Sequence, residues 1–193
     1  MITFLGNDTT REKFEWLIEE SSKDTKDIVV SCQYPYKIPK TIINNNVCVN
    51  LHFGKLPYYA GMYPVFWQII NGEEYAWITL HYMDNTFDSG DIIGFAKVEI
   101  GNKTADEVYN DLTCQAPLLL KKFYKKILKG TAPRIKQNLS QRRYYNKDSV
   151  NFDSECVLKF GTINVRELQA FHFKGKQYPT LKINDRFVEM RFI

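Results

Sequence analysis

The fold is decided by residues 47–61, which read VCVNLHFGKLPYYAG. The first seven of these residues, Val47–Phe53, follow three asparagines that indicate a turn, and their apolar, β-branched character predicts a strand. Asn50 and His52 are two residues apart, so their side chains project from the same face of this strand. Both lie near its carboxyl end, where open parallel sheets bind their ligands. The stretch therefore predicts a ligand site at one edge of a sheet.

Outward from this strand, apolar strands alternate with amphipathic helices as far as about residue 130. Ile28–Cys32 is a continuous β-branched run, the pattern of a strand that is covered on both faces in a parallel sheet. Further strands are expected at Ile2–Leu5, Tyr75–Tyr82 and Ile92–Ile100. Helices are expected after capping-box sequences at Thr9–Glu12 and Thr104–Glu107, and over Tyr63–Asn71. This order is typical of an α/β protein with a mostly parallel sheet flanked by helices.

The character of the chain changes after about residue 133. The residues that follow are polar and basic, and the last part of the chain consists of short strand-like segments. A hairpin is expected there, made of Thr180–Ile183, the turn Asn184-Asp185, and Arg186–Phe192. The sequence thus predicts a core at 1–133, a basic linker at 134–155 and a β-hairpin extension at 156–193.

Composition excludes several classes of protein. The 193-residue chain is 44% hydrophobic and 25% charged, unlike a disordered or fibrous protein. Its apolar runs are far shorter than the roughly 20 residues that cross a bilayer, and its first residues lack a basic signal-peptide region. We therefore expect a cytoplasmic protein without membrane contact. The net charge of +4 does not by itself indicate nucleic acid, and scattered cysteines with three histidines do not suggest a metal site.

Chemistry-bearing residues gather in three separate blocks. Beyond Asn50 and His52, residues 79–84 read TLHYMD and residues 87–93 read FDSGDII. Asn50, His52 and Asp88 supply an amide donor, an imidazole base and a carboxylate, a set that suits the attack of an amine on a carbonyl carbon. A single Asn or His on a strand is more often a hydrogen-bonded core residue, so the functional interpretation depends on the three occurring together.

These blocks resemble the N10-formyltetrahydrofolate-dependent formyltransferase family, whose motifs run roughly NxHxSLLPxxxG, then GxTxH, then DxGxI. The residues that match in order and spacing are Asn50, His52, Leu56, Pro57, Gly61, Thr79, His81, Asp88, Gly90 and Ile92. Departures from the family pattern stand at Gly54, Lys55, Ala60 and Trp77. The resemblance is strong over residues 27–100 and implies a Rossmann-like formyltransferase fold. Fewer residues precede Asn50 than in the family, so we expect a shortened fold: a βαβ unit is deleted, or the chain begins partway into the domain.

The resemblance also implies roles for individual residues. N10-formyltetrahydrofolate would donate the formyl group, with no metal. His52 would take a proton from the amine, Asn50 would stabilise the oxyanion, and Asp88 would orient His52 and assist proton transfer to the leaving N10. The residues expected to bind the folate are Tyr34, Tyr36, Lys37, Ile38 and Phe87. The residues expected to bind the acceptor are Lys55, Tyr59, His81, Arg142 and Arg143.

Within this family, residues 63–73 and 168–173 look most like those of sugar N-formyltransferases. Methionyl-tRNA formyltransferases add a C-terminal barrel that the residues after 133 are too few to form. The implied acceptor is the primary amine of a nucleotide-linked amino sugar, by family usage dTDP-linked, and we expect a homodimer. Three alternatives stay open: an inactive folate- or nucleotide-binding relic of the same fold, a formyltransferase for another amine, and, ranked last, a nucleic-acid-associated protein.

Overall fold

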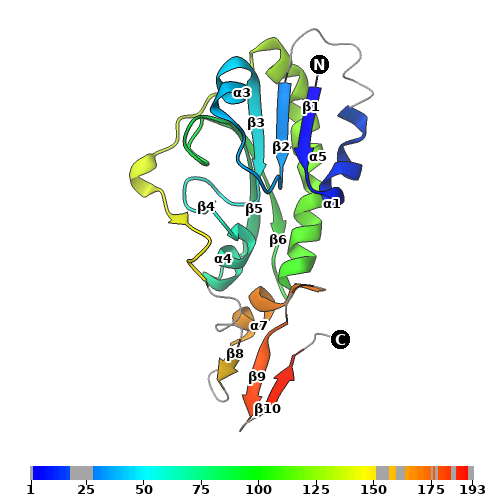
Figure 1. The fold of residues 1–193 in the computed structure, drawn as a ribbon, viewed down its shortest axis with the longest axis vertical. Coiled ribbons are helices and arrows are strands. Elements are labelled where there is room, and N and C mark those ends of the chain that lie inside the picture. The colour runs from blue at the N-terminus through cyan, green and yellow to red at the C-terminus, as the bar shows by residue number, and fades with distance from the viewer. Residues whose placement is uncertain are drawn as a thin grey trace.

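A five-stranded sheet forms the centre of the molecule (Figure 1). The computed structural model describes residues 2–17, 28–150, 157–159, 164–174, 176, 178–183 and 186–190. The strands of the sheet, in spatial order, are β1 (Ile2–Gly6), β2 (Ile28–Cys32), β3 (Val47–His52), β5 (Tyr75–Tyr82) and β6 (Ile92–Glu99). The first three run parallel, whereas β5 and β6 are antiparallel to their neighbours. The predicted α/β class and the strand positions are confirmed.

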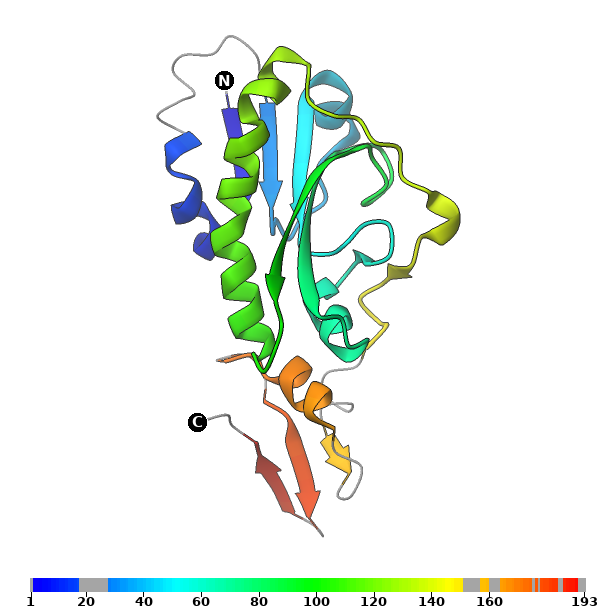
Figure 2. The ribbon, with the colours of Figure 1, turned by 180° about the vertical axis from the view of Figure 1, so that it is seen from behind.

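Helices cover the sheet. They are α1 (Asp8–Arg11), the 3₁₀ turn η1 (Glu12–Phe14), α3 (Lys40–Asn45), α4 (Pro64–Ile70) and α5 (Ala105–Lys129). The long helix α5 lies across one face of the sheet (Figure 2) and packs on β5 and β6. Its predicted capping box is present, since the Thr104 backbone N–H donates to Glu107. It ends at Gly130, whose φ of 69° is the left-handed conformation that glycine adopts without strain.

The start of α1 differs from the expectation. The sequence pattern placed a capping box at Thr9–Glu12, but the helix begins at Asp8 and its cap is Asn7. The Asn7 Oδ1 accepts the Thr10 N–H at 2.9 Å. The N-cap residue is therefore Asn7, two positions before the predicted Thr9.

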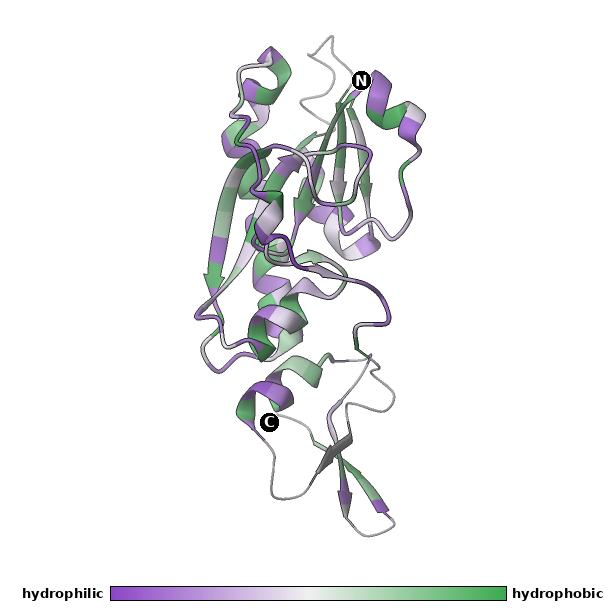
Figure 3. Cartoon of the chain, turned by 90° about the vertical axis from the view of Figure 1, so that its left-hand side faces the viewer, coloured by the Kyte–Doolittle hydropathy of each residue, from purple (hydrophilic) through white to green (hydrophobic). Residues whose placement is uncertain are grey.

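Apolar side chains between the sheet and the helices form one core. The most deeply buried side chains of the sheet, all fully shielded from solvent, include Val30, Val49, Ile78 and Leu80. The β6 strand alternates instead, with exposed Phe95, Lys97 and Glu99 between less exposed neighbours, because only one of its faces meets α5. In Figure 3 the sheet strands accordingly show many hydrophobic positions, whereas the connecting loops are more hydrophilic.

Two buried polar side chains fix the loop that follows β3. The Thr79 hydroxyl on β5 donates to the Gly54 carbonyl at 2.6 Å and accepts the Leu56 N–H at 3.1 Å. The Gln68 side chain on α4 donates to the Phe53 carbonyl and accepts the Trp77 N–H. Because three of these four bonds are buried, the end of β3 is held at a set distance from both β5 and α4.

The segment expected as a linker is hydrogen-bonded to the core over its described part, residues 134–150. Ile135 exchanges two backbone bonds with Ile92, at 2.8 and 2.9 Å. After the 3₁₀ turn η2 (Leu139–Gln141), strand β7 (Tyr144–Tyr145) pairs in parallel with β4 (Ala60–Gly61). The basic composition indicated a solvated connection, whereas these bonds make the segment a strap across the sheet edge. Residues 151–155, and with them the predicted boundary at 155, lie outside the described residues.

The C-terminal part contains the expected hairpin and one helix that was not expected. Strands β9 (Thr180–Ile183) and β10 (Arg186–Glu189) are antiparallel, and β8 (Val157–Lys159) completes a three-stranded sheet. The turn 184–185 and residues 191–193 lie outside the described residues. Helix α7 (Val165–Phe171) is capped by Asn164, whose side chain accepts the Glu167 N–H. An Asn followed three positions later by Glu was the available sequence signal for this helix.

Helix α7 attaches this part to the core. The Phe171 ring packs edge-on against Phe66 of α4, with ring centroids 5.0 Å apart. The buried Gln169 amide donates to the carbonyls of Gly101 and Lys103.

Throughout the described ranges, no helix is long and apolar enough to cross a membrane.

Candidate active site

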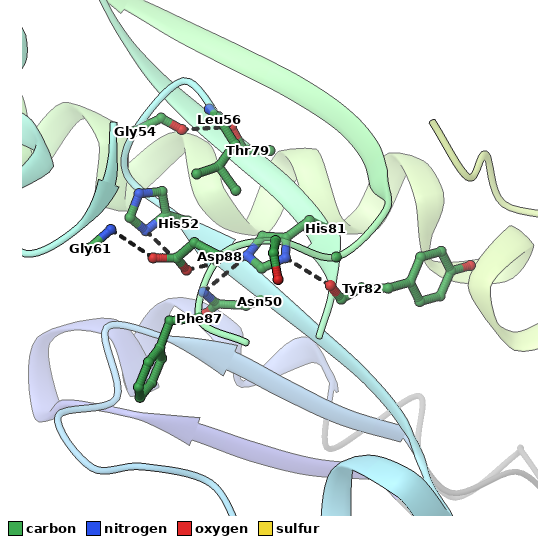
Figure 4. Close-up of polar contacts among 12 residues, drawn as sticks. Asn50, His52, Gly54, Leu56, Gly61, Thr79, His81, Tyr82, Phe87 and Asp88 are labelled. Atoms are coloured by element: carbon green, nitrogen blue, oxygen red, sulfur yellow. Dashed lines mark hydrogen bonds and ion pairs between the residues drawn. The ribbon is translucent and has the colours of Figure 1, made fainter. Parts of the chain in front are cut away.

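Asn50, His52 and Asp88 converge at the carboxyl end of β3 (Figure 4). Asn50 and His52 come from β3 itself, and the β3–β5 register places His81 opposite Asn50. Asp88 comes from the loop after β5, and its Oδ1 lies 3.6 Å from the Nδ1 of His52 and 3.7 Å from the Nε2 of His81. The sequence predicted that the three residues would meet, and the structure brings them together.

One ring nitrogen of His52 is hydrogen-bonded to the backbone. Its Nε2 lies 2.6 Å from the Tyr59 carbonyl oxygen, and a carbonyl can only accept, so Nε2 carries the hydrogen. In the neutral ring the lone pair is therefore on Nδ1, which faces the Asp88 carboxylate. A proton taken up at Nδ1 would lie between the imidazole and this carboxylate.

The close Tyr59 contact depends on Gly54. A Cβ at position 54 would come within 2.6 Å of the Tyr59 carbonyl oxygen and 2.8 Å of the His52 Nε2. The departure from the family pattern at this position thus leaves room for the backbone carbonyl that sets the His52 tautomer.

The loop that carries Asp88 is fixed by several hydrogen bonds. The Gly61 N–H donates to Asp88 Oδ2 at 2.9 Å, and the Gln137 side chain donates to the backbone carbonyls of Asp88 and Gly90. Arg142 donates to the Phe87 carbonyl at 2.7 Å. Asp88 has a φ of 53°, a left-handed conformation that Asp and Asn tolerate better than other non-glycine residues. The carboxylate is therefore held in place from both sides.

The pKa values of Asp88 and His81 are both lowered, but for different reasons. Burial alone would raise the pKa of Asp88, but His52, His81, the Gly61 N–H and Arg142 together lower it. Burial is the largest cause that lowers the pKa of His81, against the opposing charge of Asp88. At neutral pH the site thus contains a carboxylate beside a neutral imidazole.

The three residues lie in the wall of a cavity of about 710 Å³. Its lining includes all the residues that the sequence assigned to the folate: Tyr34, Tyr36, Lys37, Ile38 and Phe87. Tyr34 and Tyr36 meet edge-on at 5.5 Å, and the Lys37 ammonium lies 5.7 Å from the centre of the Phe87 ring. Aromatic faces, a cation and exposed backbone groups are a surface that a flat heteroaromatic ring can occupy.

A second group of lining residues was not found by sequence reasoning. It consists of Asn7, Tyr63, Phe66, Tyr109, Phe173 and Lys176, which come from four distant parts of the chain. The Asn7 amide donates to the Tyr109 hydroxyl at 3.1 Å, and Phe173 packs edge-on against Tyr109. No local motif connects these residues: the fold of the core brings Asn7 and Tyr109 together, and the docking of α7 adds Phe173 and Lys176.

Four of the residues expected to bind the acceptor do not line this cavity. The Lys55 ammonium lies over the Trp77 ring, the Tyr59 hydroxyl donates to Glu73, and Arg142 supports the Asp88 loop. Arg143 is exposed, and its backbone pairs with the loop after β3. The fifth, His81, lines the cavity, but its ring nitrogens contact Tyr82 and Asn50.

Among the described residues there is no group of three or more His, Cys, Asp or Glu side chains arranged to hold a metal ion.

The fold and the site together define an α/β protein with an amide, an imidazole and a carboxylate at one sheet edge. The formyl transferase family model matches residues 7–122, more than half of the chain. The chain therefore belongs to the formyl transferase family. The methionyl-tRNA formyltransferase of Acetivibrio thermocellus is 36% identical over 121 residues, which are 61% of this chain and 39% of that protein. The chain thus spans about two fifths of the length of this curated relative.

Solved structures resemble the chain over a larger share of its length. A 4-N formyltransferase from Francisella tularensis superposes with a TM-score of 0.82 at 21% identity, covering 100% of this chain and 97% of that chain. WlaRD, a sugar 3N-formyl transferase solved in the presence of dTDP and 5-N-formyl-THF, has a TM-score of 0.69 and 26% identity, covering 82% and 58% of the two chains. The overall fold is thus that of sugar N-formyltransferases.

Proposed function

We propose that this protein transfers a formyl group from N10-formyltetrahydrofolate to the primary amine of a nucleotide-linked amino sugar, with a dTDP-linked sugar as the first candidate. The observation that carries the proposal is that Asn50, His52 and Asp88 line the same cavity as two further groups of residues, one with Tyr34, Tyr36, Lys37 and Phe87 and one with Asn7, Tyr109 and Phe173. A reaction between two large substrates needs such an arrangement, because both must reach the same catalytic groups.

The residues expected to bind the folate suit the donor. Tyr34, Tyr36 and Phe87 would pack on the pterin ring, and the cations Lys37 and Lys40, which also line the cavity, would pair with the carboxylates of the folate tail. The relative solved in the presence of 5-N-formyl-THF supports a folate donor.

Proton transfer starts at His52. An amine attacks only in its neutral form, and the Nδ1 lone pair of His52 is available to remove the amine's proton, because Nε2 is occupied by the Tyr59 carbonyl. Asp88, 3.6 Å away, would stabilise the resulting imidazolium.

Asn50 would stabilise the negative charge that develops on the formyl oxygen. As the new C–N bond forms, negative charge develops on the formyl oxygen, and the Asn50 N–H₂ is the side-chain donor in position to stabilise it. When the bond between the formyl carbon and N10 breaks, N10 needs a proton. The proton that His52 took from the amine, held between His52 and Asp88, is then transferred to N10.

The side of the cavity with Tyr109, Phe173 and Lys176 suits the acceptor. Aromatic rings can pack on a nucleobase, and the exposed Lys176 can pair with a diphosphate. We assign the acceptor contacts to these residues in place of Lys55, Tyr59, Arg142 and Arg143, which do not line the cavity. We further propose a cytoplasmic homodimer.

A second candidate acceptor follows from the curated relatives, which are methionyl-tRNA formyltransferases. The deciding experiment supplies N10-formyltetrahydrofolate together with dTDP-, UDP- or GDP-linked amino sugars, or with methionyl-tRNA, and follows the mass of each acceptor. A gain of one formyl group on a dTDP-sugar supports the proposal, and formylation of the tRNA alone would replace it. Folate or dTDP binding in a thermal-shift assay without any formylated product would indicate an inactive relic.

A further inference from the structure

His81 faces Asn50 across the β3–β5 pair and is almost fully buried. Its Nδ1 lies 2.8 Å from the Tyr82 carbonyl oxygen, and its Nε2 lies 3.4 Å from the Asn50 Nδ2. Because the Tyr82 carbonyl can only accept, Nδ1 carries the hydrogen of the neutral ring. The Nε2 atom then has only a lone pair to offer.

This lone pair determines which end of the Asn50 amide faces His81. An amide can rotate by half a turn with little change of shape, exchanging its oxygen and its nitrogen. If the Asn50 oxygen faced Nε2, two acceptors would oppose each other in a partly buried place, which is unfavourable. With the nitrogen there, one N–H binds His81 and the second N–H stays available for the cavity that Asn50 lines.

We propose that His81 is a positioning residue for formyl transfer: its neutral ring, protonated on Nδ1, fixes the Asn50 amide so that its second N–H meets the formyl oxygen. This inference rests on the proposed function. It reassigns His81, which sequence reasoning placed among the acceptor-binding residues, to a role that it performs through Asn50.

The surroundings of His81 are consistent with a neutral ring. The charged or titratable groups near it are Asp88, His52 and Asp84, and burial outweighs the two carboxylates, so the pKa of His81 is lowered. A protonated His81 would carry a hydrogen on Nε2 and would favour the rotated Asn50 amide, with its oxygen toward the ring.

The tautomer can be measured without any substrate. In protein labelled with ¹⁵N at histidine, two-bond ¹H–¹⁵N correlations distinguish a ring protonated on Nδ1 from one protonated on Nε2, and His81→Gln identifies the signal. We expect Nδ1–H at neutral pH. An Nε2–H or doubly protonated ring would overturn the proposal, whether or not the protein proves to be a formyltransferase.

The coupling to Asn50 is tested by kinetics. His81→Leu removes the acceptor for the amide, and we expect kcat to fall at least about tenfold, with the KM of both substrates nearly unchanged, since a lost oxyanion donor costs about 10²–10³ in rate. His81→Gln keeps an acceptor oxygen and should recover most of the loss. In an Asn50→Ala background, His81→Leu should have no further effect.

Equal effects of His81→Leu in both backgrounds, or a Gln variant as slow as the Leu variant, would overturn the proposal. His172→Leu is the matched control, because His172 is also a buried histidine but pairs with Asp106 away from Asn50. Its effect should be the same with and without Asn50. If wild-type protein forms no product, the proposed function fails, and the tautomer measurement still decides the position of the His81 hydrogen.

Discussion

At the residue scale, the site depends on which atom of each imidazole is already occupied. His52 and His81 each use one ring nitrogen to bind a backbone carbonyl, of Tyr59 and Tyr82 respectively. They use opposite nitrogens, so His52 presents Nδ1 to Asp88 and His81 presents Nε2 to Asn50. Two chemically identical side chains thus present different ring nitrogens to the site, and for this reason we propose different roles for them: His52 as the base and His81 as the residue that orients the amide.

His52→Asn removes the base and keeps a polar side chain of similar reach. We expect turnover to fall by at least about 10², the usual scale for loss of a general base. Folate binding should be retained, because His52 is not among the residues assigned to the folate. Calorimetric binding and single-turnover mass analysis measure the two quantities, and near-wild-type turnover would refute the assignment of the base.

Asp88→Asn removes the charge beside His52 without changing the shape of the side chain. Asn also tolerates the left-handed conformation of residue 88, so the melting temperature should change little while kcat falls sharply. The same variant tests the alternative that Asp88 only closes a turn with Gly90, in which case Asn would serve almost as well. An unchanged kcat would support that turn interpretation and contradict a catalytic Asp88.

The lowered pKa of His81 predicts how stability changes with pH. The ordinary pKa of histidine is about 6.5, and His81 lies below it in the folded protein, so between the two values the unfolded chain binds more protons. The free energy of unfolding should therefore fall as the pH drops below about 6.5, and His81→Gln should flatten this dependence. Asp88, whose pKa is lowered from a value near 4, loses its contribution only at lower pH.

Urea titrations of the two proteins between about pH 5 and 8 measure the difference. Parallel curves for wild type and His81→Gln would show that His81 is not the group that titrates.

At the element scale, the site depends on elements that are far apart in the chain. Strands β3 and β5 supply Asn50, His52 and His81, and the strap at 134–150 holds the Asp88 loop through Gln137 and Arg142. Helix α7 docks the part of the chain that carries Phe173 and Lys176. All of these elements therefore hold residues of the site in place, but only some of them supply the side chains proposed for the reaction.

Gln169→Leu tests the docking of α7. The Gln169 amide is buried and donates to two carbonyls, of Gly101 and Lys103, which the variant would leave without this donor. A loss of about 1–3 kcal/mol in the free energy of unfolding is expected. Val165→Ala is the control on the same helix, because Val165 is exposed and should cost less than about 0.5 kcal/mol. Equal effects of the two variants in chemical denaturation would contradict the buried role of Gln169.

At the scale of the whole molecule, strand β10 is an edge strand of the three-stranded C-terminal sheet. Within the described residues it pairs only with β9, and Phe187 and Val188 on it are 62% and 46% exposed. An apolar edge strand can pair with another chain. We expect light scattering at micromolar concentration to give the mass of a homodimer.

Phe187→Glu should shift this mass toward the monomer, because the charge would have to be buried in the interface. Leu118→Glu is the control, since Leu118 is similarly exposed at 58% but lies on α5. A monomer mass for the wild type would contradict the homodimer.

The sequence by itself determined the α/β class, the strands of the sheet and the three residues proposed for catalysis. Strands and helices depend on periodicity within a dozen residues, and the spacing of Asn50, His52 and Asp88 is a local feature of the motif blocks. The five residues assigned to the folate all line the cavity, and four of them are within a single segment that follows β2; their binding of folate stays a prediction.

Only the tertiary structure decided which further residues line the cavity and which atoms His81 contacts. Lys55, Tyr59 and the arginines at 142 and 143 have suitable chemistry, but they do not line the cavity. Asn7, Tyr109, Phe173 and Lys176 line it although no spacing connects them. Likewise, the tautomer of each histidine depends on a backbone carbonyl that the fold places beside it. The physical reason is that hydrogen bonds and cavity walls form between groups close in space, and the pairing of distant strands and helices that brings them together leaves no periodic pattern in the sequence.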